Sequence, residues 1–98
     1  MSDKLSIADL QAGIRHLHDC GSIFVESVPV VERHAGEVMW TGEVQVFELV
    51  NHPRARRAYV WSYAIDGSEK RRVVAVLHVA PVVSPETAVR AAIVALKK

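Results

Sequence analysis

The sequence lacks the features that mark several common classes of protein. It has a single cysteine, Cys20, so an intrachain disulfide is impossible and a reducing compartment is expected. Its longest apolar run, residues 73–83, is interrupted by His78 and Pro81 and is too short to span a bilayer. The amino terminus opens Ser2-Asp3-Lys4 and develops no signal-peptide apolar segment. The sequence therefore predicts a cytoplasmic location.

An excess of charge of one sign is also missing. There are 12 lysines and arginines against 11 aspartates and glutamates, a net charge of +1, so general attraction to polyanions is not expected. No complete catalytic or nucleotide-binding signature is present. The motif His16-x-His18-x-Cys20 would place only His16 and Cys20 on one helical face, and no second ligand pair accompanies it. The sequence predicts no metal and no cofactor, and it leans against an enzyme without deciding the question.

A β-hairpin is the clearest feature that is present. From Tyr59 to Ile65, large side chains fall on odd positions and small ones on even positions, the period of a strand. Asp66-Gly67 supplies turn residues, and residues 73–79 return with many β-branched side chains. A preceding strand is predicted over residues 40–50. These segments predict three consecutive antiparallel strands.

Pairing of these strands predicts which face is buried. If residues 66–69 form one loop and residues 51–54 form the other, both loops place the aromatic side chains together on one face. The predicted partners are Tyr63 with Arg72, Trp61 with Val74, Tyr59 with Val76, Val46 with Tyr59, and Val44 with Trp61. Two independently chosen loops therefore indicate that the aromatic face lies in the core.

The two ends of the chain predict helices. Ser6 and Asp9 resemble a capping box before an apolar stripe over residues 7–19. Ser84-Pro85-Glu86 is a typical helix opening before a second stripe. Residues 23–32 predict a first strand, at an edge or bulged because of Pro29. The expected fold class is α+β: residues 1–98 form one domain, α-β-β-β-β-α, with both helices on the aromatic face of a four-stranded antiparallel sheet.

An apolar patch then remains on the opposite sheet face. Such a patch usually marks an association surface. The sequence therefore predicts a protein-interaction module that forms a homo-oligomer, or binds a protein partner, through that open face. The residues assigned to this interface are Phe47, Val60, Val73, Ala75 and Leu77.

Clustered basic residues support an alternative, binding to RNA or DNA. The cluster members are Arg54, Arg56, Arg57, Lys70, Arg71 and Arg72. They fall at opposite ends of the strand that starts the hairpin, roughly 25 Å apart at ~3.3 Å per residue. Phosphates on a duplex could bridge that distance. His78, on the aromatic face, is left open as either structural or functional.

Overall fold

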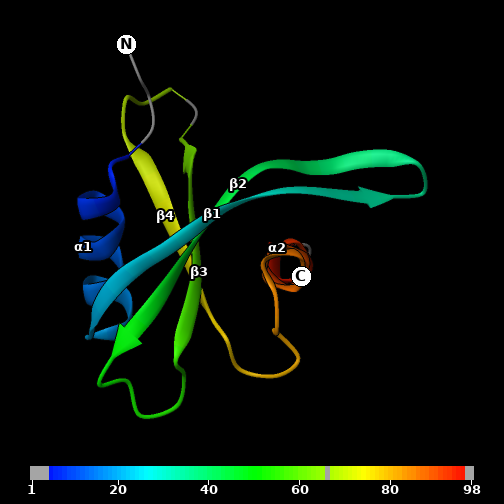
Figure 1. The fold of residues 1–98 in the computed structure, drawn as a ribbon. Helices are drawn as coiled ribbons and strands as arrows, with labels where there is room; N and C mark the ends of the chain where they lie inside the picture. Colours follow the sequence, from blue (N-terminus) through cyan, green and yellow to red (C-terminus); the bar gives the residue numbers. More distant parts are fainter. Residues whose placement is uncertain (1–4, 66, 97–98) are drawn as a thin grey trace.

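The chain folds into six elements arranged around one sheet (Figure 1). This computed structural model describes residues 5–65 and 67–96. The elements are α1 (Ile7–His18), β1 (Gly21–His34), β2 (Glu37–Val50), β3 (Arg57–Ala64), β4 (Arg71–Leu77) and α2 (Pro85–Leu96). The strands form one antiparallel sheet in the order β1-β2-β3-β4. The predicted α+β class and element order are confirmed.

The capping box of α1 is formed as the sequence predicted. The Asp9 backbone N–H donates to Ser6 Oγ at 3.1 Å, and the Ser6 N–H donates to the Asp9 carboxylate at 3.0 Å. Hydrogen bonding of the Asp9 carboxylate to the Ser6 backbone N–H, and then to the Ser6 side chain, holds the pKa of Asp9 below its ordinary value. Asp19 caps the helix: its N–H donates to the Arg15 carbonyl, and its left-handed backbone turns the chain out of the helix.

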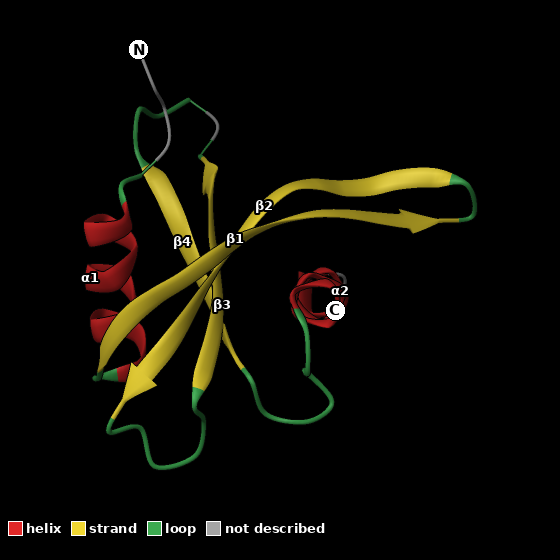
Figure 2. Cartoon of the chain, viewed as in Figure 1, coloured by secondary structure: helices red, strands yellow, loops and turns green. Residues whose placement is uncertain are grey.

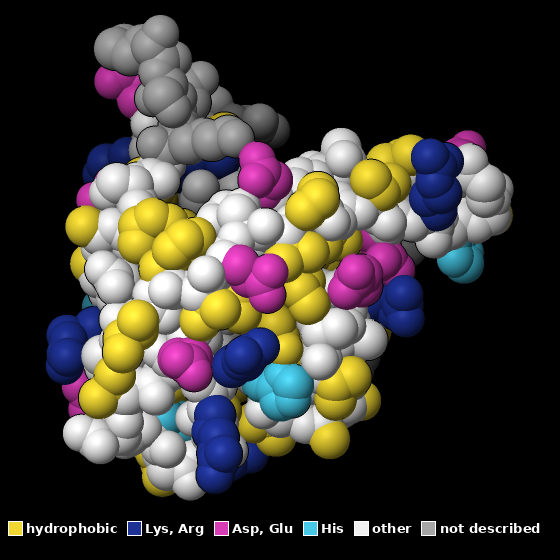
Figure 3. Space-filling view, viewed as in Figure 1, with side chains coloured by type: hydrophobic (Ala, Val, Ile, Leu, Met, Phe, Trp, Pro, Cys, Tyr) yellow, Lys and Arg dark blue, Asp and Glu magenta, His cyan; other side chains and the backbone are white. Residues whose placement is uncertain are grey.

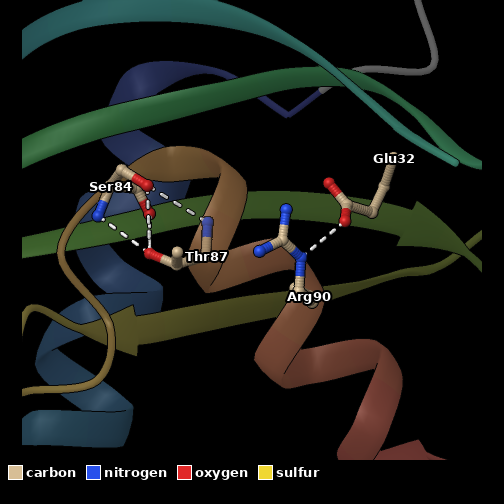
Figure 4. A network of polar contacts seen from close by, with 4 residues as sticks. All are labelled: Glu32, Ser84, Thr87 and Arg90. Carbon is tan, nitrogen blue, oxygen red and sulfur yellow. Dashed lines mark hydrogen bonds and ion pairs between the residues drawn. The ribbon is translucent and has the colours of Figure 1, made fainter.

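The start of α2 is fixed by two hydroxyl side chains (Figure 4). The Thr87 N–H donates to Ser84 Oγ at 3.2 Å, and the Ser84 N–H donates to Thr87 Oγ1 at 2.9 Å. This reciprocal pair satisfies backbone donors that the first turn of a helix leaves without intrahelical partners. The predicted helix opening at Ser84 is therefore confirmed.

The strand register agrees with the prediction over the hairpin. The β3–β4 pairs include Tyr59 with Val76, Trp61 with Val74 and Tyr63 with Arg72. Val46 lies beside Tyr59 in the β2–β3 ladder, also as predicted. The predicted pairing of Val44 with Trp61 is not made, because the β2–β3 ladder ends one step earlier. Asp66, assigned to the turn, lies outside the described residues.

The placement of the helices differs from the prediction: they cover opposite faces of the sheet (Figure 2). On the aromatic face, Ala88 and Val89 of α2 pack with Tyr59 and Trp61. On the other face, α1 packs through the apolar side chains Leu10 and Ile14 against Phe47, Ala58 and Val60. The prediction of both helices on one face was wrong. Because both faces of the sheet are apolar, each needs its own covering layer.

The sheet face predicted to be open is consequently covered. Phe47 and Val60 are fully buried beneath α1. Val73, Ala75 and Leu77 are half-buried and pack against the same cluster. The assignment of these five residues to an exposed interface is corrected: they belong to the core between α1 and the sheet.

The β1–β2 hairpin extends beyond the other strands as an arm that lies over α2 (Figure 1). Val30 of the arm is buried among α2 residues. Glu32, only 9% exposed, accepts a 2.7 Å hydrogen bond from Arg90 Nε of α2 (Figure 4). This contact raises the pKa of Arg90. Within residues 5–65 and 67–96, no helix has the length and hydropathy needed to cross a membrane.

Candidate binding cleft between two diverging strands

The sheet splits between its two central strands. The β2–β3 ladder runs from Glu48 paired with Arg57 to Gln45 paired with Val60, and stops there. Both strands continue, since β2 extends back to Glu37 and β3 extends on to Ala64. A wedge-shaped gap therefore opens from the last pair, Gln45 and Val60, which we call the apex.

Side chains from four elements line this gap and form a cleft of about 630 Å³. That volume falls within the range of ordinary ligand sites. The lining residues are Leu5, Ser6, Ile7 and Leu10 at the start of α1, Trp40–Gly42, Glu43 and Gln45 on β2, Trp61–Ala64 on β3, and Arg71 on β4. We call this the β2–β3 cleft.

Two tryptophans close the cleft on the α2 side of the sheet. The rings of Trp40 and Trp61 meet edge to face, with centroids 5.7 Å apart. Trp40 can lie this way because Gly42 has no side chain: a Cβ there would be 3.0 Å from the far edge of the indole. The two rings form an apolar wall, and Trp61 itself is only 6% exposed.

Backbone groups of β3 point into the cleft. The Arg57 carbonyl accepts from the His78 N–H and the Ile65 N–H donates to Lys70, so odd residues of β3 bond toward β4. In an antiparallel ladder the direction alternates with each residue. The N–H and C=O groups of Ser62 and Ala64 therefore face β2 across the split, where β2 no longer pairs with them.

Arg71 occupies part of the position that a neighbouring strand would fill. Its Nε donates to Ser62 Oγ and its Nη2 to the Ser62 carbonyl, both at 2.9 Å. Its remaining N–H groups make no ion pair with a carboxylate of residues 5–65 or 67–96. The guanidinium thus brings an available positive charge to the wall of the cleft.

The outer edges of the sheet are capped in part. On β4, His18 Nε2 donates to the Ala75 carbonyl and the Val79 N–H donates to Leu77. On β1, Gln11 donates to the Ser22 carbonyl. Pro29, which has no N–H, lies on the outward-facing positions of the same strand. Capping of this kind disfavours pairing with another chain at these positions. The split offers open backbone between two strands, beside a lined cleft.

The basic residues predicted for nucleic-acid binding remain in two groups. Arg54, Arg56 and Arg57 are exposed at the start of β3, and Lys70 and Arg72 are exposed at its far end. The face in Figure 3 shows lysine and arginine side chains dispersed among acidic and apolar ones. Only Arg71 of this set joins the cleft. Its contact with Ser62 was not predicted, because no local pattern in the sequence indicates that β2 leaves β3.

His78 contacts the hydroxyl of a buried tyrosine. Its Nδ1 shares a 2.5 Å hydrogen bond with Tyr59 Oη, and burial raises the pKa of the Tyr59 phenol. Neither side chain lines the β2–β3 cleft. Over the described part of the chain, no group of three or more histidine, cysteine or acidic side chains is placed to hold a metal ion.

The single thiol is expected to react slowly in the folded protein. Cys20 is 5% exposed, and burial raises the pKa of its thiol, which lowers the thiolate fraction near neutral pH. Disulfide-exchange reagents should modify Cys20 more slowly in buffer than in urea, by a factor on the order of 10² or more. Absorbance of the released thiolate measures both rates. Equal rates would show that Cys20 is accessible in the native state.

The fold and the cleft define an α+β domain with a split central sheet. Comparison with protein-family models gave no match. Comparisons with curated proteins and with solved structures also gave none. The function is therefore argued from the geometry of the chain itself.

Proposed function

We propose that this chain is a small cytoplasmic protein-interaction module that binds an extended segment of a partner protein in the β2–β3 cleft. The observation that carries the proposal is that β2 and β3 stop pairing at Gln45 and Val60 while both continue as strands. An extended peptide can satisfy such backbone groups by strand addition, a common mode of recognition.

The composition of the cleft supports a peptide. Its walls combine apolar side chains, such as Trp40 and Ile7, with backbone groups at Ser62 and Ala64. Strand addition draws affinity from main-chain hydrogen bonds and specificity from pockets for alternate side chains. We therefore place the interaction surface in the split of the sheet, and not on the sheet face that α1 covers.

Proline substitution provides a direct test. The Ala64 N–H points into the cleft and not toward β4, so Ala64→Pro removes a donor for the ligand without breaking the β3–β4 ladder. Peptides selected from a random displayed library should bind Ala64→Pro about tenfold more weakly than the parent, because losing a backbone hydrogen bond leaves a buried group unpaired. Fluorescence anisotropy of labelled peptides gives the dissociation constants.

Val31→Pro is the matched control. The Val31 N–H points to the outer edge of β1, because the backbone groups of its partner Thr41 face β3 across the split and not β1. This variant should bind the selected peptides within about twofold of the parent. Amide hydrogen exchange should also slow at Ser62 and Ala64 when peptide binds. A library that yields no binder, or peptides that bind Ala64→Pro and the parent equally, would contradict the proposal.

A further inference from the structure

The β2–β3 cleft is open at one end only. At the apex, Gln45 and Val60 pair directly and leave no room for a strand between them. Leu10 of α1 is packed on one face there, and Trp61 lies in the core on the other. A strand that enters beside Ala64 therefore meets a closed end. A chain terminus fits this geometry better than the middle of a long segment.

The positive charge of Arg71 favours a carboxyl terminus over an amino terminus as the ligand. The Arg71 guanidinium reaches from the level of Ala64 to the Ser62 carbonyl, two residues from the apex. Its end-on N–H groups can hold a carboxylate by two hydrogen bonds. The carboxylate of Glu43, also in the lining, accepts a 2.7 Å hydrogen bond from Ser27 of β1. Arg71 lies against β3, whereas Glu43 lies on the β2 wall. A terminus that pairs with β3 therefore meets the cation, which attracts a carboxylate and repels an ammonium group.

We infer that the β2–β3 cleft binds the carboxy-terminal tail of a partner protein, with the free α-carboxylate on Arg71. This inference rests on the function proposed above. β3 runs from the apex toward Ala64, so a tail whose carboxylate lies near Ser62 runs antiparallel to β3. Antiparallel pairing is slightly more stable per residue than parallel pairing. It uses the inward-facing N–H groups of Ser62 and Ala64 and the Ala64 carbonyl, since the Ser62 carbonyl already accepts from Arg71.

The walls also select the last side chains of the tail. Alternate side chains of a strand point to opposite faces of a sheet. One would meet the indoles of Trp40 and Trp61, and the next would meet Ile7 and Leu10 at the start of α1. Both environments are apolar. The ligand class is therefore an extended tail that ends in two apolar residues and a free carboxylate.

The test compares two libraries of random hexapeptides, one displayed with free carboxyl ends and one fused through its carboxyl ends. The first should yield binders that end in apolar residues. Synthetic copies of these binders should lose about tenfold in affinity when the carboxylate is converted to an amide. The Arg71→Gln variant should bind the free-acid and the amide form of each peptide with equal affinity. Arg72→Gln, an exposed neighbour outside the lining, should keep the tenfold preference.

The outcomes separate this inference from the function on which it rests. Binders from the fused library that remain sensitive to Ala64→Pro would support strand addition and overturn the carboxyl-terminal assignment. Equal binding of acid and amide to the parent would overturn the same assignment. Failure of both libraries would contradict both proposals. A concentration-dependent dimer that Ala64→Pro dissociates would identify the occupant as a second copy of this chain.

Discussion

Phe47→Ala is expected to lower the free energy of unfolding by about 3–5 kcal/mol. The Phe47 side chain is fully buried between α1 and the sheet. Its ring packs edge to face with that of Phe24, and the two ring centroids are 5.7 Å apart. Truncation to a methyl group removes apolar contacts and leaves a cavity that the close-packed surroundings fill only partly. Urea denaturation followed by tryptophan fluorescence measures the change.

Ile23→Ala is the matched control for this substitution. Ile23 lies on β1 next to Phe24 but is 58% exposed, so its truncation should change the free energy of unfolding by less than about 1 kcal/mol. The comparison tests the placement of α1 directly. If Phe47→Ala kept full stability and instead converted a dimer to a monomer, Phe47 would belong to an open interface and α1 would not cover it.

Gly13→Val is expected to be destabilising by roughly 1–3 kcal/mol through overpacking. Gly13 lies in the middle of α1, where a glycine ordinarily weakens a helix. Glycine is needed here because α1 lies close to β4: a Cβ at this position would lie 2.9 Å from Val73 Cγ1. Larger side chains would push α1 away from the sheet. Thermal unfolding followed by circular dichroism measures the loss.

Val73→Ala should partly rescue this variant, because it removes the methyl groups that collide with the new side chain. The double variant should be more stable than the sum of the two single losses predicts, by roughly 0.5–3 kcal/mol, the range of coupling for residues in contact. Arg72→Ala, an exposed change at the adjacent position, should give no such coupling. Additive losses for Gly13→Val and Val73→Ala would contradict the contact between α1 and β4.

The local pattern of the sequence predicted the hairpin pairing correctly. Alternation through Tyr59–Ala64, a short loop and a β-branched return leave few registers that keep large side chains on one face. The same reasoning placed Val46 beside Tyr59, which the structure confirms. This reasoning did not predict the split beyond Gln45, because it assumed that β2 and β3 stay paired over their whole length.

The cleft depends on contacts between segments that the sequence keeps far apart. Trp40 packs over Gly42 on β2, and its ring meets that of Trp61 from β3. The arm curls over α2, where Glu32 bonds to Arg90, and β2 leaves the line of β3. Arg71 was grouped with its basic neighbours as a phosphate ligand. Its contact with Ser62 exists only because β2 has left that position.

By itself, the sequence determined the elements and their order, since helix caps, strand periodicity and turn chemistry act between near neighbours. Tertiary structure decided which helix covers which face. Both faces of the hairpin are apolar, so burial alone does not assign α1 to either, and the close approach of Gly13 to Val73 resolves the choice. The open N–H groups at Ser62 and Ala64 are also a product of tertiary structure, since they lie where β2 leaves β3 and its arm packs on α2.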